Sequence, residues 1–269
     1  MYTLDFILIF LLGTIIGSFL NVVIYRFNTG KSITKGRSVC MSCNRTLRWY
    51  ELIPIFSFLI QSGRCRRCAS SISHQYPLVE LITGIMFVLL SWHFLPLLLV
   101  SYSYFIYSLI LYSFLFSLLI VISFYDINHK IIPNALVYLF SIISFLSIFV
   151  LYTQSGFTII IPSLFAILSG PIFALPFVLL WFISKGKWMG LGDSKLILGI
   201  GWLLGYATFS SLVLSFWIGA IVGLILLIPS SSKKNKVNMK TEIPFAPFLV
   251  LGLFITILFN FNILSLLIF

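Results

Sequence analysis

Apolar runs about as long as a bilayer is thick recur along this sequence, and they constrain its fold more than any other feature. A bilayer core of about 30 Å needs roughly 20 apolar residues in a helix. Eight such runs can be read, at residues 4–25, 77–94, 102–125, 132–152, 158–184, 194–206, 209–228 and 244–268. The sixth run is short, so seven spans with a re-entrant segment is the alternative. The sequence therefore predicts an all-α, polytopic membrane bundle of about eight transmembrane helices.

The composition excludes a water-soluble globule. Hydrophobic residues make up 60% of the chain and charged residues 9%, whereas a soluble domain carries about 25% charged residues. The first run has no basic segment before it and no small-residue cleavage site, and it continues directly into Arg26. These features argue against a removable signal peptide, so we expect a retained first helix.

The basic residues lie on one side of the predicted membrane. Of the 17 Lys and Arg, 16 fall in the loops after the first, third, fifth and seventh runs, and Lys195 lies at the edge of the loop after the fifth, at the very start of the sixth run. By the positive-inside rule these loops are cytoplasmic and both termini lie outside, which predicts a multi-pass protein of the cytoplasmic membrane. Loop topology then accounts for the net charge of +11, and no nucleic-acid partner is expected. The lysines expected to contact anionic membrane lipid are Lys233, Lys234, Lys236 and Lys240.

One cytoplasmic insert, at about residues 26–76, is large enough to fold in water, and it holds all four cysteines. Two C-x-x-C pairs, Cys40 with Cys43 and Cys65 with Cys68, are separated by 21 residues. This spacing predicts a zinc-ribbon-like site in which four thiolates close a tetrahedral shell around a structural zinc ion. A redox-active dithiol pair is the alternative, although the reducing cytosol disfavours disulfides.

Only six acidic residues are present, and two of them have an unusual position. Asp126 ends the third run and Asp193 stands just before the sixth, so both carboxylates lie at the same predicted depth near the cytoplasmic surface. Two adjacent carboxylates cannot both ionise cheaply, so one keeps its proton while the other acts as a general base on water. This is the chemistry of an aspartic protease. The structural alternative is a pair of interface acids bound to Lys130 and Lys195, or acting as helix caps.

Short motifs follow one another in a characteristic order along the chain. Two surround the aspartates: Asp126 followed by Ile132-Pro133-Asn134, and Gly190-Leu191-Gly192-Asp193-Ser194-Lys195-Leu196. The others are Gly17-Ser18-Phe19-Leu20-Asn21-Val22 with Arg26, the four cysteines, Glu51-Leu52-Ile53-Pro54-Ile55 with Ser57, Gly63 before Cys65, Tyr76-Pro77-Leu78-Val79-Glu80-Leu81, and Pro244-Phe245-Ala246-Pro247. In this order the set resembles the type IV prepilin peptidases, membrane aspartic proteases of the GxGD kind.

The resemblance implies an endopeptidase that removes the short basic leader from prepilins and pseudopilins at the cytoplasmic membrane face, after a glycine. It implies that Asp126 and Asp193 form the catalytic dyad and that the cut needs no metal. Many members then methylate the new N-terminal amine with S-adenosylmethionine, an activity associated with the cysteine-bearing loop. We accordingly expect a first transmembrane helix at 1–25, the four-cysteine insert at 26–76 and the peptidase domain at 77–269.

The residues that would bind the methyl donor are less well defined, because the insert contains no G-x-G-x-x-G segment. Glu51, Gly63 and Glu80 are the candidates. Glu51, Glu80 and Glu242 are also the acids available to receive a basic leader. The chain departs from the family at residues 185–188, which read Lys-Gly-Lys-Trp where members often carry an acidic residue and a glycine. Substrate preference or loop motion is therefore expected to differ.

Two other classes of function compete with the peptidase. A transporter would carry ionisable groups or broken helices at the bilayer midplane, and the predicted spans hold no Asp, Glu, Lys or Arg there. A membrane scaffold for pilus or secretion assembly would use the zinc loop for partner binding and leave the aspartates idle. Such a scaffold would lose all function without its cysteines and would tolerate replacement of both aspartates.

Overall fold

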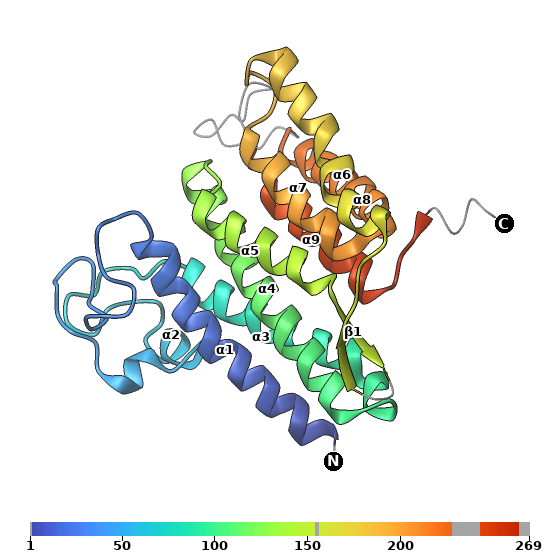
Figure 1. The fold of residues 1–269 in the computed structure, drawn as a ribbon. Coiled ribbons are helices and arrows are strands. Elements are labelled where there is room, and N and C mark those ends of the chain that lie inside the picture. The colour runs from blue at the N-terminus through green and yellow to red at the C-terminus, as the bar shows by residue number, and fades with distance from the viewer. Residues whose placement is uncertain (1, 154–155, 228–242, 264–269) are drawn as a thin grey trace. The chain divides into compact units, whose positions relative to one another are not determined.

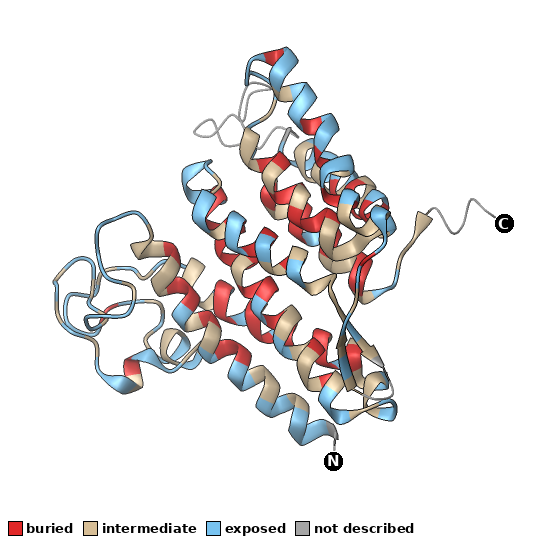
Figure 2. Cartoon of the chain, in the orientation of Figure 1, coloured by how far each residue is buried: buried red, intermediate tan, exposed pale blue. Residues whose placement is uncertain are grey.

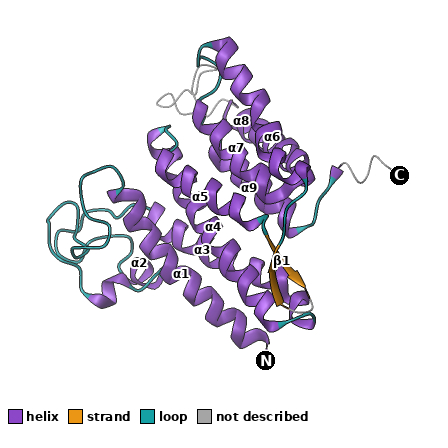
Figure 3. Cartoon of the chain, in the orientation of Figure 1, coloured by secondary structure: helices purple, strands orange, loops and turns teal. Residues whose placement is uncertain are grey.

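Each of the eight predicted apolar runs contains an α-helix in the computed structural model, which describes residues 2–153, 156–227 and 243–263. Helices dominate the structure (Figure 3), and this confirms the predicted all-α class. The chain forms two compact units, Met1–Val121 and Ile122–Phe269. The division falls within helix α4 (Tyr102–His129), so both predicted catalytic residues belong to the second unit and all four cysteines to the first.

Five helical stretches of the described residues are long and apolar enough to cross a membrane. They are Thr3–Arg26, Gln75–Leu99, Tyr102–His129, Leu164–Ser184 and Leu191–Leu226. The last stretch joins two of the predicted spans, and the apolar helices Asn134–Ser147 and Ala246–Leu258 are shorter. The protein is therefore a membrane protein built from helices of unequal length.

The first unit is organised around an antiparallel pair of helices, α1 (Tyr2–Arg26) and α3 (Gln75–Phe94) (Figure 1). Small residues let the two backbones approach closely: a Cβ on Gly13 would lie 2.9 Å from Cα of Gly84, and one on Gly17 would lie 2.8 Å from Cα of Glu80. One turn further on, Nδ2 of Asn21 donates a hydrogen bond to the Tyr76 carbonyl at 3.0 Å. The insert therefore begins at the C-terminal end of α1 and ends at the neighbouring N-terminal end of α3.

The insert has little regular structure. It contains a 3-10 turn η1 (Trp49–Leu52) and a short helix α2 (Phe56–Ile60), and the 3-10 turn η2 (Leu95–Leu99) follows α3. Most insert residues are exposed or half-buried (Figure 2). Because the insert has no extended apolar core of its own, local hydrogen bonds and the cysteine cluster determine its shape.

The second unit departs from the predicted spans at its beginning. Helix α5 (Asn134–Ser147) ends well before the predicted boundary, and a two-stranded antiparallel hairpin follows, with β1 (Val150–Thr153) paired to β2 (Gly156–Ile159). Pro133 fixes the start of α5 with a φ of −73°. Beyond Ser147 the chain is rich in β-branched and aromatic residues, and these favour strands as readily as membrane helices.

Helix α7 (Leu191–Leu204) lies between α5 and α6 (Leu164–Ser184) in the second unit. A Cβ on Gly199 would meet the Phe140 ring of α5 at 2.6 Å, and one on Gly201 would meet Cα of Gly170 in α6 at 2.6 Å. The 3-10 turn η3 (Gly205–Ala207) leads into α8 (Thr208–Leu227), which packs on α9 (Ala246–Leu258). This tight packing positions α7, and Asp193 lies in its first turn.

Candidate active site and metal centre

Asp126 is held in the last turn of α4 by the start of α9. Its side chain is buried, with 4% of the residue exposed, and Oδ2 accepts a hydrogen bond from the backbone N–H of Ala246 at 3.3 Å. Ala246 is the first residue of α9, so this N–H has no partner within its own helix. The carboxyl group is therefore oriented by an element 120 residues away in sequence.

Asp193 occupies the third position of α7 and is also buried, with 9% of the residue exposed. Asp126 is near enough for its charge to act on this carboxyl group, although 67 residues separate the two aspartates in sequence. A carboxylate in the first turn of a helix interacts favourably with the helix dipole. Each aspartate thus stands beside the N-terminus of a helix.

The two glycines before Asp193 meet different surroundings. A Cβ on Gly192 would lie 2.8 Å from Cβ of Ile132, so the chain after α4 packs directly against the start of α7. A Cβ on Gly190 would find no atom closer than 3.9 Å and would lie 4.0 Å from Oδ2 of Asp193. Space for an approaching backbone therefore remains at Gly190 and not at Gly192.

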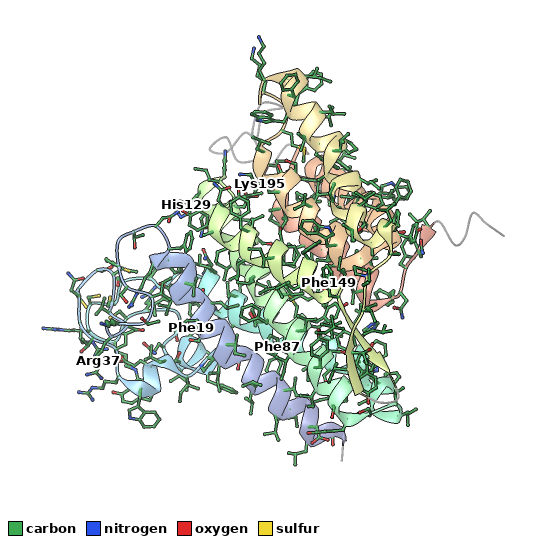
Figure 4. The ribbon with its side chains drawn as sticks, viewed as in Figure 1. Phe19, Arg37, Phe87, His129, Phe149 and Lys195 are labelled. Atoms are coloured by element: carbon green, nitrogen blue, oxygen red, sulfur yellow. The ribbon has the colours of Figure 1, made fainter. Side chains whose placement is uncertain are left out.

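The Lys195 side chain, close in sequence to Asp193, has other partners. Nζ of Lys195 donates a hydrogen bond to Oδ1 of Asn134 at 2.9 Å and lies 5.2 Å from the centre of the Tyr138 ring. Figure 4 labels Lys195 on α7 and His129 at the end of α4. In the part of the chain that the structure describes, no ion pair joins Asp126 or Asp193 to a lysine. Among the described residues, therefore, no lysine neutralises the charge of the buried carboxyl pair.

The four cysteines form one cluster in the first unit. Their sulfur atoms all lie within 4.8 Å of one another, and Sγ of Cys40 is 3.8 Å from Sγ of Cys68. Tetrahedral zinc with Zn–S distances of about 2.3 Å requires sulfur atoms about 3.8 Å apart. The cluster therefore fits a thiophilic metal such as zinc.

The two C-x-x-C pairs are built alike. The N–H of Cys40 bonds to the Arg45 carbonyl at 2.9 Å, and the N–H of Cys65 bonds to the Ser70 carbonyl at 2.9 Å. Each turn ends in a residue of positive φ, Asn44 at 52° and Ala69 at 55°. Two equivalent turns facing one another are the construction of a zinc ribbon.

Backbone hydrogen bonds already prepare part of the cluster to bind a cation. The N–H groups of Cys43 and Ser42 lower the pKa of Cys40 to about 6. At Cys43 the N–H of Arg45 acts to lower the pKa, but burial and the neighbouring thiol groups outweigh it and raise the pKa to about 11. One thiolate thus forms readily and the next does not, which is expected of a cluster that needs a metal ion to ionise fully.

The residues predicted to bind the methyl donor all lie in the first unit, where the two glutamates bind other groups of the protein. The buried Glu51 carboxylate pairs with the Arg45 guanidinium and accepts the Arg48 backbone N–H at 2.8 Å. The buried Glu80 carboxylate accepts the N–H of Ile55 at 2.7 Å. Gly63 adopts a φ of +65° at the turn after α2. Glu242, the third acid considered for the leader, lies outside the described residues, as do Lys233, Lys234, Lys236 and Lys240.

One functional contact was not foreseen from the sequence. The Ala246 N–H that orients Asp126 belongs to the Pro244-Phe245-Ala246-Pro247 motif. The motif contributed to the resemblance, but a backbone donor leaves no signature in residue type. The available signal was the pair of prolines that enclose Phe245 and Ala246, since only these two residues of the motif have a backbone N–H.

Two family models match the chain. Residues 11–94 match the Bacterial Peptidase A24 N-terminal domain, and residues 113–228 match the Type IV leader peptidase family. The relatives of the chain include proteins named prepilin leader peptidase/N-methyltransferase. The protein of Myxococcus xanthus is 32% identical over 82% of this chain and 63% of its own length. That of Stutzerimonas stutzeri is 28% identical over 93% of this chain and 89% of its own. That of Bacillus subtilis is 30% identical over 96% of both.

The chain belongs to the type IV leader peptidase family. This membership confirms the resemblance and the expected enzyme class. The match to the A24 N-terminal domain covers the cysteine insert, and the match to the leader peptidase family covers both aspartates. No solved structure matches the chain significantly.

Proposed function

We propose that this chain is a membrane endopeptidase that removes the leader from type IV prepilins and pseudopilins, with Asp126 and Asp193 as its catalytic dyad. The observation that carries the proposal is the buried pair itself: two carboxyl groups from α4 and α7 that interact electrostatically and have no lysine partner among the described residues. The names of the relatives support the substrate class. Burying two interacting acids costs free energy, so a pair of this kind indicates a functional site.

The cut follows from one proton held between two carboxyl groups. The ionised aspartate takes a proton from a water molecule, whose oxygen attacks the carbonyl carbon of the scissile peptide. The protonated aspartate donates its proton to the carbonyl oxygen. The tetrahedral intermediate then collapses as its C–N bond breaks, and the amine leaves with a proton returned from the dyad. Ala246 holds Asp126 in position throughout, and the open side of Gly190 admits the substrate backbone.

We further propose that the dyad faces the cytoplasm. The loops that carry or adjoin the basic residues are assigned to that side, and both aspartates adjoin such loops, with Lys130 after α4 and Lys187 before α7. A leader that is itself basic and cytoplasmic would then reach the dyad without crossing the membrane. Its apolar helix would remain in the bilayer during the cut.

N-methylation of the product is proposed for the insert at residues 26–76, on the strength of the relatives' names and the A24 N-terminal match. Cys40, Cys43, Cys65 and Cys68 would hold a structural zinc ion that fixes the two turns to one another. For S-adenosylmethionine the described residues show no equivalent fit, because the carboxylates of Glu51 and Glu80 are both engaged within the unit. No step is therefore assigned to either residue.

Replacement of one dyad member at a time tests the proposal. Asp126→Asn and Asp193→Asn remove a proton-transfer group while keeping the shape of the side chain, so each is expected to lower leader cleavage by at least about 100-fold. Asp5→Asn is the matched control, because Asp5 is an exposed acid in the first turn of α1. The measurement is cleavage of a co-expressed prepilin, read by mass spectrometry of its N-terminus. Unchanged cleavage in both dyad variants would refute the assignment.

A further inference from the structure

The insert carries a row of large apolar side chains that its own fold leaves uncovered. Within residues 49–60 the structure exposes six of them: Trp49 (77%), Leu52 (40%), Ile53 (40%), Phe56 (58%), Leu59 (65%) and Ile60 (71%). A segment surrounded by water rarely exposes so much contiguous apolar surface. The segment, called the 49–60 segment below, therefore has a partner outside the insert.

A buried hydrogen bond ties the 49–60 segment to the membrane helices. The Glu80 carboxylate, in α3, accepts the N–H of Ile55 at 2.7 Å, and Glu80 is only 7% exposed. Ile55 adopts a φ of +61° and a ψ of −53°, a strained conformation for a β-branched residue. Such strain persists only where the surroundings impose it. The chain is thus turned sharply at Ile55 and held against α3, and α2 begins at the next residue.

The tether lies well below the ends of the helices. Glu80 is five residues into α3, about 7.5 Å from its start at 1.5 Å per residue. On α1 the facing residue is Gly17, which is nine residues and about 14 Å before Arg26. The α1 span of 24 residues is about 36 Å long, and the hydrocarbon core is about 30 Å thick. Ile55 is therefore held against the side of α3, within the length of the α1–α3 pair and not beyond its end.

Exposed apolar side chains are present on α1 and α3 as well as on the 49–60 segment. Phe19 on α1 is 50% exposed, and Leu78 and Leu81 on α3 are 47% and 41% exposed. Phe19 is two residues from Gly17, and the two leucines flank Glu80, so all three lie near the level of the tether. Figure 1 shows α2 beside these helices, in agreement with the hydrogen bond. The tether thus holds one group of exposed apolar side chains at the level of another.

Aromatic and basic side chains at the start of the 49–60 segment match a membrane interface. Trp49 contacts Tyr50, with ring centres 5.8 Å apart. The Arg48 guanidinium donates to the Tyr50 hydroxyl at 3.1 Å, and the Arg66 guanidinium lies 5.2 Å from the Tyr50 ring centre. Trp and Tyr are the residues enriched at the headgroup level of bilayers. Exposed arginines beside them complement anionic headgroups.

We propose that the 49–60 segment is embedded in the cytoplasmic interface of the bilayer, with its apolar side chains among the acyl chains and with Arg48 and Arg66 on anionic headgroups. The insert is then held to the membrane by two connections, its covalent ends and this segment. The inference rests on the first unit alone, so it stands or falls independently of the dyad. The competing partner is the apolar helix of a substrate, and the experiment distinguishes the two.

The test measures depth with a fluorescent amino acid in the full chain, loaded with zinc and reconstituted in vesicles. One variant carries the probe in place of Leu59. The matched control carries it in place of Arg37, an exposed residue of the insert outside the 49–60 segment that Figure 4 labels. Brominated lipid tails quench a probe in the acyl region, and iodide quenches a probe in water. Equal zinc content in both variants verifies that the insert is folded.

Brominated lipid is expected to quench the Leu59 probe and iodide to spare it, with the reverse result at Arg37. Quenching of the Leu59 probe by brominated lipid should be stronger in vesicles rich in phosphatidylglycerol than in phosphatidylcholine alone, and Arg48→Gln should reduce that difference. A Leu59 probe as open to iodide as the Arg37 probe would overturn the proposal. Shielding of Leu59 only after a prepilin is added would overturn it in favour of the substrate. Equal quenching in the two lipids would overturn the role of the arginines.

Discussion

Among single residues, the glycines of the Gly190-Leu191-Gly192-Asp193 motif divide two tasks between them. Gly192 has no space for a side chain, because a Cβ there would lie 2.8 Å from Cβ of Ile132. Gly190 has space, and that space opens toward the Asp193 carboxylate. Gly190 therefore leaves space beside the Asp193 carboxylate, and Gly192 allows α7 to pack closely on Ile132. The sequence alone does not distinguish these two roles.

Gly192→Ala is expected to destabilise the protein and to reduce leader cleavage, because the added methyl group must push Ile132 away from the first turn of α7. Overpacking of this kind costs about 1–3 kcal/mol. Gly190→Ser is the matched control, since it places a larger side chain in open space at a helix N-cap where Ser is favoured. Thermal unfolding in detergent reports the difference. Equal unfolding temperatures for the two variants would contradict the close contact with Ile132.

Thiol reactivity gives a prediction for the cysteine cluster. The N–H groups of Cys43 and Ser42 lower the pKa of Cys40 to about 6, whereas that of Cys43 is raised to about 11. Because the thiolate is the nucleophile, iodoacetamide should alkylate Cys40 before Cys43 in metal-free protein at neutral pH. The rate at Cys40 should fall as the pH drops through 6, where the thiol regains its proton. Peptide mapping by mass spectrometry identifies the site, and zinc-loaded protein, which should be protected, is the control. Faster alkylation of Cys43 would exclude this arrangement.

Among the structural elements, the α1–α3 pair depends most directly on residue size. Gly13, Gly17 and Gly84 bring the two backbones together, and the same approach places Glu80 where it can hold Ile55. The register continues one turn further, where Asn21 bonds to the Tyr76 carbonyl. The geometry of this helix pair thus determines where the insert is attached.

Gly17→Ala tests this dependence. The new Cβ would lie 2.8 Å from Cα of Glu80, a backbone atom that cannot give way as a flexible side chain can, so a loss of about 1–3 kcal/mol is expected. Gly223→Ala in α8 is the control, because its Cβ would meet nothing closer than the tip of Ile243 at 3.9 Å, and Ala favours a helix over Gly by about 1 kcal/mol. Unfolding in detergent should therefore shift in opposite directions. A Gly17→Ala variant as stable as the parent would show that the helices do not approach so closely.

A helix could be predicted from the sequence where the apolar run is long enough to span the membrane without interruption, as at α1, α4 and α8. The sequence was less decisive between residues 132 and 163, where an apolar run conceals a short helix followed by a hairpin. Composition cannot separate these outcomes, because Val, Ile and Tyr suit both a lipid-facing helix and a strand. The approach of Asp126 to Asp193 followed from matching depth, but the Ala246 donor did not, since the backbone N–H looks the same in every residue except proline. Long-range partners of the backbone become visible only in three dimensions.

At the scale of the whole molecule, the two chemistries expected of the family belong to different compact units. The cysteine cluster lies in Met1–Val121, and both aspartates lie in Ile122–Phe269 with the Ala246 donor. Each unit has its own internal contacts, and the helices that hold Asp126 and Asp193 carry no residue of the insert. The fold therefore permits one activity to be lost without the other.

Loss of zinc is accordingly expected to separate methylation from cleavage. Cys40→Ser with Cys65→Ser removes one sulfur from each turn, so the insert should lose its metal and its shape, because a closed four-thiolate site contributes directly to folding. The helices that carry Asp126 and Asp193 are untouched, so the leader should still be removed, and the exposed amine should remain unmethylated. Mass spectrometry of a co-expressed pilin reports both events on one N-terminus, and metal analysis verifies the loss of zinc. A fall in cleavage as deep as that of Asp126→Asn would mean that the dyad needs the insert. If the cysteine variant lost all function while both aspartate variants kept theirs, the chain would act as a metal-organised scaffold.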